Sequence, residues 1–278
     1  MNKLMVFNYC AIPIFLIILC TTFIRKTTKR LPNRLFILII CVSLFTVLVD
    51  LLADGYQRML PFTPLQLAVV TAANYTYFVA RNAIAFLYLL FLLSLTRTGY
   101  RFQRPAARIL LALPYCLVLC VLFTNPLHHG AFLVTAGSGY IRGPLLSVFY
   151  AASILYCAFG AVHLVYCAKV LRTGKWLALM SMYFLSFTGI FIQLFFPKIL
   201  IEIFATAVAL LMVVLLVLRP EEITDTNVAL PSWKAYCDEL YKIVKMRRPV
   251  HINIVRYINA SQVREYLGEE RFYDYCEA

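Results

Sequence analysis

The chain has 278 residues, of which 62% are hydrophobic and 14% are charged, and its mean hydropathy is +0.80. A soluble domain has roughly 45–50% apolar and about 25% charged residues, so this composition excludes an ordinary soluble protein and predicts an all-α integral membrane protein. The formal net charge is +13. Residues 1–218 contain 17 Lys and Arg against 3 Asp and Glu, whereas residues 219–278 contain 9 against 10. The excess positive charge therefore lies between apolar runs, which argues against nucleic acid as a partner and favours the lipid bilayer.

Seven apolar runs are long enough, or nearly long enough, to cross a hydrocarbon core, which needs about 20 helical residues. They are 5–24, 35–53, 70–95, 108–124, 144–168, 176–195 and 199–218. Twelve Lys and Arg residues lie in the loops after the first, third and fifth runs, and four lie on the other side. Because short cytoplasmic loops carry the excess of Lys and Arg, we expect seven transmembrane helices with the N-terminus outside. The protein would be a multi-pass protein of the cell membrane with a cytoplasmic C-terminal tail.

The composition changes near Arg219-Pro220. This change predicts a transmembrane domain over 1–218, a linker over 219–224 and a small α/β tail over 225–278. The nine cysteines include no CxxC pair, so the sequence predicts neither a zinc site nor a disulfide framework. We expect no metal and no cofactor.

Ionisable residues inside spans are rare and costly, so they are candidates for function. Asp50 lies near the outer end of the second run, Arg81 in the third run and Glu202 early in the seventh, and Asn74 and Asn82 accompany Arg81. Arg81 could pair with either acid. One interpretation is an outward-facing polar pocket for a small ligand, and the other is a structural ion pair that fixes helix packing.

The longest connection on the outer side covers residues 124–144. There the turn sequence GSG separates two β-like runs, AFLVTA and YIRG, which predicts a short hairpin. The hairpin could cover the pocket as a lid, with His128, His129 and Arg142 as its candidate residues. Two adjacent histidines without a third ligand are weak evidence for a metal site, and a solvated loop is the alternative. We expect His163, at a different depth in the fifth run, to be packed or hydrogen-bonded.

Several pieces of the first 218 residues carry a loose resemblance to a known sensor region. They are the segment Asn125, Pro126, Leu127 and His128 after the fourth run, the glycine-bearing hairpin, and Gly143-Pro144 before the fifth run. This arrangement resembles the seven-helix sensor region at the amino terminus of some bacterial histidine kinases and diguanylate cyclases. The resemblance implies a signal-sensing protein.

The tail reads as a helix over 233–244, a strand over 250–258 and a short helix over 259–267 that ends before Gly268. This order resembles the opening of a GGDEF domain, the catalytic domain of diguanylate cyclases. Of the family's opening pattern D-x-L-T-G-L-x-N-R, Asp225 and Leu230 match and the remaining positions do not. An unrelated amphipathic tail is the alternative.

The resemblance implies that the polar residues of the cyclase site have been replaced. With Gly268 on the family's glycine, a metal-binding aspartate is replaced by Arg256, the second by Ile258, the phosphate-contacting lysine by Ser261, the nucleotide-recognising asparagine by Arg264 and a further aspartate by Tyr273. Mg²⁺ requires oxygen ligands such as carboxylates, and a guanidinium repels the cation. The sequence also ends before the family's signature loop, so we expect a truncated, degenerate module and no enzymatic activity.

These observations predict a non-catalytic membrane sensor that passes an extracytoplasmic or intramembrane signal to its tail. A homodimer or a cytoplasmic signalling partner is implied by the resemblance. A small-solute transporter is the alternative from another class. A membrane enzyme acting on lipid would need a clustered set of catalytic side chains at one interface, and the runs and loops offer none.

Overall fold

The computed structural model describes most of the apolar part of the chain and several segments of the tail. The described residues are 5–24, 31–96, 98, 105–168, 171, 173–196, 200–217, 236–237, 240–241, 243–244, 251–252 and 259–267. The chain divides into two units, one made of Met1–Ala168 and Thr173–Val217 and the other of Lys169–Arg172 and Leu218–Ala278.

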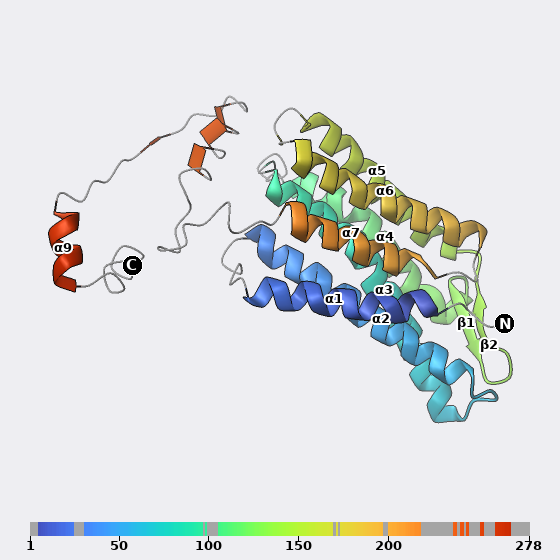
Figure 1. Cartoon of the computed structure of the whole chain (residues 1–278). Helices are drawn as coiled ribbons and strands as arrows, with labels where there is room; N and C mark the ends of the chain where they lie inside the picture. The colour runs from blue at the N-terminus through green and yellow to red at the C-terminus, as the bar shows by residue number, and fades with distance from the viewer. Residues whose placement is uncertain are drawn as a thin grey trace. The chain divides into compact units, whose positions relative to one another are not determined.

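Among its described residues, the first unit contains seven apolar helices (Figure 1). They are α1 (Val6–Ile24), α2 (Leu31–Gln57), α3 (Pro64–Leu95), α4 (Pro105–His128), α5 (Leu146–Tyr166), α6 (Thr173–Phe195) and α7 (Glu202–Leu216). Six of them, α1 to α6, are long and apolar enough to cross a membrane, and α7 is an apolar helix of 15 residues. The structure therefore bears out a helical, multi-pass membrane protein.

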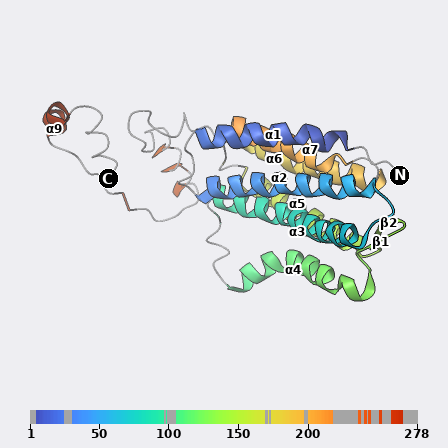
Figure 2. The same ribbon diagram turned by 90° about the horizontal axis from the view of Figure 1, so that it is seen from below.

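Contacts between neighbouring helices connect six of the seven in a cycle, in the order α1, α2, α3, α5, α6, α7 and back to α1. Helix α4 lies outside this cycle, where it contacts α3 and α5, and Figure 2 shows it at the edge of the bundle. Only 11% of its most apolar stretch is buried, against 28–50% for the other five candidate spans. Most of the surface of α4 is therefore available to lipid.

Four helices, α2, α3, α4 and α6, are longer than the apolar runs that predicted them, because main-chain hydrogen bonding continues past the apolar residues. Helix α3 begins six residues before its run. There Thr63 Oγ accepts a hydrogen bond from the Gln66 amide, Gln66 Oε1 accepts one from the Thr63 amide, and Pro64 occupies the first turn. Helix α4 continues to His128, so the prediction that the outer loop begins at residue 124 is wrong.

The predicted hairpin is confirmed, with β1 (Phe132–Thr135) paired antiparallel to β2 (Gly139–Arg142). Gly139 has φ of +71°, a left-handed conformation that glycine adopts without a steric penalty. The base of the hairpin is held by Asn125 of α4. Its Oδ1 accepts hydrogen bonds from the amides of Ala131 and Phe132, and its Nδ2 donates to the Phe132 carbonyl and to Tyr75 Oη.

Aromatic side chains fix the hairpin to the helices. The ring of Phe132 lies 5.4 Å from that of Phe78 in α3 and 4.8 Å from that of Tyr75, and Phe78 also contacts Phe149 of α5 at 5.3 Å. Phe132 and Phe149 are buried. Such ring pairs add to the energy of apolar burial, so the hairpin is anchored to α3, whose Phe78 packs in turn against α5.

In the second unit the structure describes one regular helix, α9 (Ala260–Leu267). It confirms the short helix predicted before Gly268. Residues 236–237, 240–241 and 243–244 are helical, and His251 and Ile252, the described part of the predicted strand, are in no regular element. Ser261 and Arg264 lie in α9, whereas the predicted linker over 219–224 and the positions Arg256, Ile258 and Tyr273 lie outside the described residues.

Candidate functional site

A buried ion pair joins α3 to α7. Arg81 Nη2 donates to Glu202 Oε2, and Arg81 Nε donates to Glu202 Oε1 at 3.3 Å. The two side chains are 9% and 15% exposed, respectively. The guanidinium also lies over the ring of Tyr150, 5.1 Å from its centroid, and 5.9 Å from that of Tyr77. Glu202 occupies the first turn of α7, where the helix dipole favours an acidic side chain.

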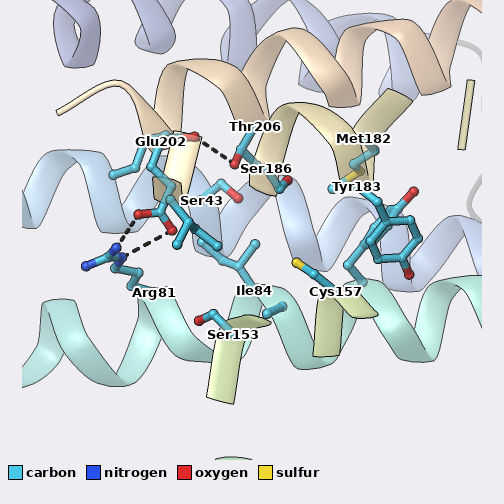
Figure 3. Close-up of a pocket in the computed structure, with 14 residues that line it drawn as sticks. Ser43, Arg81, Ile84, Ser153, Cys157, Met182, Tyr183, Ser186, Glu202 and Thr206 are labelled. Carbon is cyan, nitrogen blue, oxygen red and sulfur yellow. Dashed lines mark hydrogen bonds and ion pairs between the residues drawn. The ribbon is translucent and has the colours of Figure 1, made fainter. Parts of the chain in front are cut away.

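The ion pair forms one wall of a cavity between five helices, α2, α3, α5, α6 and α7 (Figure 3). The lining residues are Ser43, Arg81, Ile84, Ala85, Tyr88, Ser153, Cys157, Met182, Tyr183, Ser186, Ile190, Glu202, Ile203 and Thr206. The volume of the cavity is about 40 Å³. A cavity needs about 10–15 Å³ for each water that it holds, so there is room for about three water molecules.

Two hydroxyl groups of this cavity have no hydrogen-bond partner among the described residues. They are Ser43 Oγ on α2 and Tyr183 Oη on α6, and both side chains are more than nine-tenths buried. A buried polar group without a partner is costly. The cavity therefore has unused hydrogen-bonding capacity in two places. One is Ser43, near Glu202, and the other is Tyr183, at the side away from Arg81 (Figure 3).

Two glycines let the cavity walls approach closely. A Cβ added to Gly160 of α5 would overlap the phenol of Tyr183, so the absence of a side chain makes room for that ring. The ring also packs edge to face against Tyr88, with the centroids 4.9 Å apart. On α6, a Cβ at Gly189 would lie 3.0 Å from the Cα of Glu202, which brings α6 against the beginning of α7.

The structure divides the five residues that the sequence grouped into one pocket. Arg81 and Glu202 meet and line the cavity, whereas Asp50, Asn74 and Asn82 do not line it. Asp50 is buried and its Oδ2 accepts a hydrogen bond from Asn8 Nδ2 of α1 at 2.7 Å. Of the two acids that Arg81 could have paired with, the structure thus shows a direct ion pair with Glu202.

The two asparagines of α3 mainly serve their own helix. Asn74 Nδ2 donates to the carbonyl of Val70, four residues earlier, and Asn82 Nδ2 donates likewise to Phe78. Asn82 Oδ1 also accepts a long hydrogen bond, 3.5 Å, from Ser153, which lines the cavity. Asn82 is therefore separated from the cavity by Ser153.

The sequence interpretation missed one buried acid, Asp54, which lies four residues after Asp50 in α2. Its side chain is 11% exposed and pairs with Arg58 at 2.9 Å, while the Arg58 side chain is 67% exposed. It also missed the hydroxyl groups of the cavity, because serine, threonine and tyrosine are common in apolar helices. The signal that was available is one hydroxyl residue at similar depth in several runs, such as Ser43, Ser153 and Thr206.

The candidate lid residues take local structural roles. His128 Nδ1 accepts a hydrogen bond from the Gly130 amide at 2.8 Å, and His128 Nε2 lies 3.0 Å from Thr124 Oγ1. His129 has φ of +50° at the end of α4, and Arg142 ends β2 opposite Phe132. None of these three lines the cavity.

Tyr140 of β2 is a half-buried residue of the hairpin. Burial raises the pKa of its phenol to about 12, while the nearby Arg142 acts in the opposite direction. Its ring stacks at 6.0 Å on Phe132. The phenol of Tyr140 therefore stays neutral up to a higher pH than that of a fully exposed tyrosine.

His163 of α5 is hydrogen-bonded, as predicted. Its Nε2 lies 3.2 Å from Thr96 Oγ1 and 3.0 Å from Thr98 Oγ1 at the end of α3, and 3.5 Å from Cys167 Sγ. The cluster ties the end of α3 to the end of α5. Among the described residues, no group of three metal-ligating side chains is present, and the described cysteines are free.

Comparisons with known proteins were made for the whole chain. It matches no family model, and neither the curated proteins nor the solved structures contain a significant match.

Proposed function

We propose that the chain is a non-catalytic membrane sensor in which a ligand bound between the helices changes the packing of α7. In this proposal the seven helices cross a bacterial inner membrane, with the N-terminus outside and the tail in the cytoplasm. The positive loops support the orientation. The observation that carries the proposal is the Arg81–Glu202 ion pair, because it combines a cavity with a link to the last helix before the tail.

The link has a simple physical basis. A ligand shifts a conformational equilibrium only if it binds the two states with different affinity. A molecule that contacts Arg81 or Glu202 changes the attraction between α3 and α7, and α6 transmits part of the strain because Gly189 lies against the backbone of Glu202. In the sequence, α7 ends at Leu216, two residues before Leu218, where the second unit resumes.

The coupling can be tested without a known ligand. The variant Arg81→Met/Glu202→Met removes the ion pair and keeps the side-chain volume, a kind of replacement that is often neutral or stabilising. Amide hydrogen exchange of full-length protein in lipid nanodiscs should change in α9 (260–267) when the pair is removed. The matched control is Asp54→Asn/Arg58→Gln, which removes the pair on α2 and should leave this exchange as it is. Unchanged exchange in both variants would contradict the sensor function.

The tail adds a second part to the proposal, a cyclase-like module that has lost its catalytic residues. Purified protein with Mg²⁺ and GTP should give no cyclic di-GMP, and neither should the variant Arg256→Asp. Product made by the unmodified chain would overturn this assignment.

A small-solute transporter is the second candidate, because five helices surround the cavity. Saturable uptake of a solute into proteoliposomes, lost in Arg81→Met/Glu202→Met, would favour the transporter over the sensor.

A further inference from the structure

The charges of the cavity restrict what can bind there. Arg81 and Glu202 compensate each other, and both are removed from water. An anion that took the place of Glu202 on Arg81 would leave the Glu202 carboxylate buried without this ion pair, and a cation on Glu202 would take the same ion pair from the Arg81 guanidinium. Breaking a buried pair by removing one partner is strongly destabilising. A ligand that inserts between the two charges must therefore bring one charge of each sign.

The hydroxyl groups and the apolar side chains that line the cavity restrict the ligand further. Ser43 Oγ and Tyr183 Oη have no hydrogen-bond partner in the part of the chain that the structure describes, so a ligand with hydrogen-bonding groups gains by satisfying them. The apolar residues Ile84, Met182 and Ile203 can take a short aliphatic group. Room for about three waters limits the ligand to a few heavy atoms at the observed helix packing.

We propose that the cavity binds a small zwitterion of the α-amino acid class, whose carboxylate pairs with Arg81 while its ammonium pairs with Glu202. The inference rests on the proposed ligand-sensing function and names its ligand class. Insertion replaces one direct ion pair by two, and it moves Glu202 away from Arg81, so that α7 separates from α3.

The test uses purified full-length protein in detergent. Equilibrium dialysis measures the binding of radiolabelled glycine and of radiolabelled alanine. Acetate, methylammonium and acetamide serve as competitors, because each carries only one feature of glycine. Glycine or alanine should bind saturably, and a large excess of any single competitor should displace little of it. Competition by acetate or by methylammonium alone at concentrations similar to glycine would overturn the proposal, and so would an absence of saturable binding by the unmodified protein.

Two variants make the test specific to the cavity. Arg81→Met/Glu202→Met should weaken glycine binding by at least about tenfold, the effect of losing one charge-assisted hydrogen bond. Asp54→Asn/Arg58→Gln should leave it unchanged. If the double methionine variant does not fold, Ser43→Ala takes its place, and it should weaken binding by about two- to tenfold, the worth of one neutral hydrogen bond. Equal binding by all of these proteins would place glycine elsewhere and overturn the proposal.

Hydrogen exchange in α9 separates this inference from the sensor function. Saturable, pair-dependent glycine binding without a change in exchange supports the ligand class and contradicts the coupling. A change in exchange on removing the ion pair, without any glycine binding, supports the coupling and overturns the ligand class.

Discussion

The hairpin base and the cavity are both polar regions inside an apolar molecule, but they differ in how far their hydrogen bonds are satisfied. At the hairpin base, the Asn125 side chain uses both its oxygen and its nitrogen in four hydrogen bonds. In the cavity, two hydroxyl groups have no partner among the described residues. A saturated polar cluster holds a structure in place, whereas an unsaturated one has hydrogen-bonding capacity left for a ligand or water.

The largest effect on stability should come from removing one charge of the ion pair in the cavity. Glu202→Gln takes the carboxylate partner away from the buried Arg81 guanidinium, so we expect the free energy of unfolding to fall by about 3–5 kcal/mol. Thermal or denaturant unfolding in detergent measures this loss. The control removes both partners of the other pair, because Asp54→Asn/Arg58→Gln leaves no charge behind and should cost much less than Glu202→Gln. Equal losses for the two variants would contradict the cost of leaving one buried charge behind.

The hairpin base should respond next. Asn125→Ala leaves the amide of Ala131 and the carbonyl of Phe132 without this partner, at a cost of about 1–3 kcal/mol for each group that finds no other. Proteolysis of the outer connection should become faster as the hairpin loosens, while unfolding of the helices is less affected. Unchanged proteolysis would mean that the aromatic contacts of Phe132 are enough to hold the hairpin.

A pair of glycines tests the same region with smaller changes. A Cβ on Gly143 would overlap the backbone of Gly130, whereas nothing lies within 4 Å of a Cβ on Gly137. We expect Gly143→Ala to destabilise the protein by about 1–3 kcal/mol, a typical cost of overpacking, and Gly137→Ala to have little effect. Similar unfolding temperatures for the two variants would contradict the close approach at Gly143.

The hairpin should also weaken at high pH. Burial raises the pKa of Tyr140 from 10.0 to about 12, so the folded protein keeps the neutral phenol while the unfolded chain ionises. The stabilisation by this group is fully present below pH 10 and is lost as the pH rises from 10 to 12. Comparing the pH dependence of unfolding in the unmodified protein and in Tyr140→Phe isolates this residue, because the other tyrosines are common to both. Identical pH profiles would contradict its burial.

The smallest effect on stability should come from Ser43→Ala, and it should be neutral or stabilising, unlike the other substitutions. Its hydroxyl has no partner in the described residues, so Ser43→Ala removes a desolvation cost and should leave stability unchanged or raise it by up to about 1 kcal/mol. The same substitution should weaken glycine binding. A clear loss of stability without ligand would show that the hydroxyl is satisfied in the folded protein.

The sequence was most informative where periodicity or turn chemistry leaves one solution. Apolar runs located all seven helices, and GSG located the hairpin. It was least informative about neighbours, because a run defines neither which face of a helix turns inward nor which helices meet. Arg81 could therefore not be assigned to Glu202 rather than Asp50, the hydrogen bond from Asn8 to Asp50 was missed, and the position of α4 outside the helix cycle had no sequence signal. The boundaries were wrong where polar caps extend a helix, as at Thr63.

Helix α7 has 15 residues and measures about 22 Å at 1.5 Å per residue, whereas a hydrocarbon core is about 30 Å thick. In the proposed seven-span topology this difference is a hydrophobic mismatch, which thins the bilayer around α7 or draws adjacent apolar residues into it. Lipid chain length would then act on the same helix that carries Glu202. Bilayer thickness, varied in nanodiscs of defined acyl chains, is thus a second variable to which the ion pair would respond.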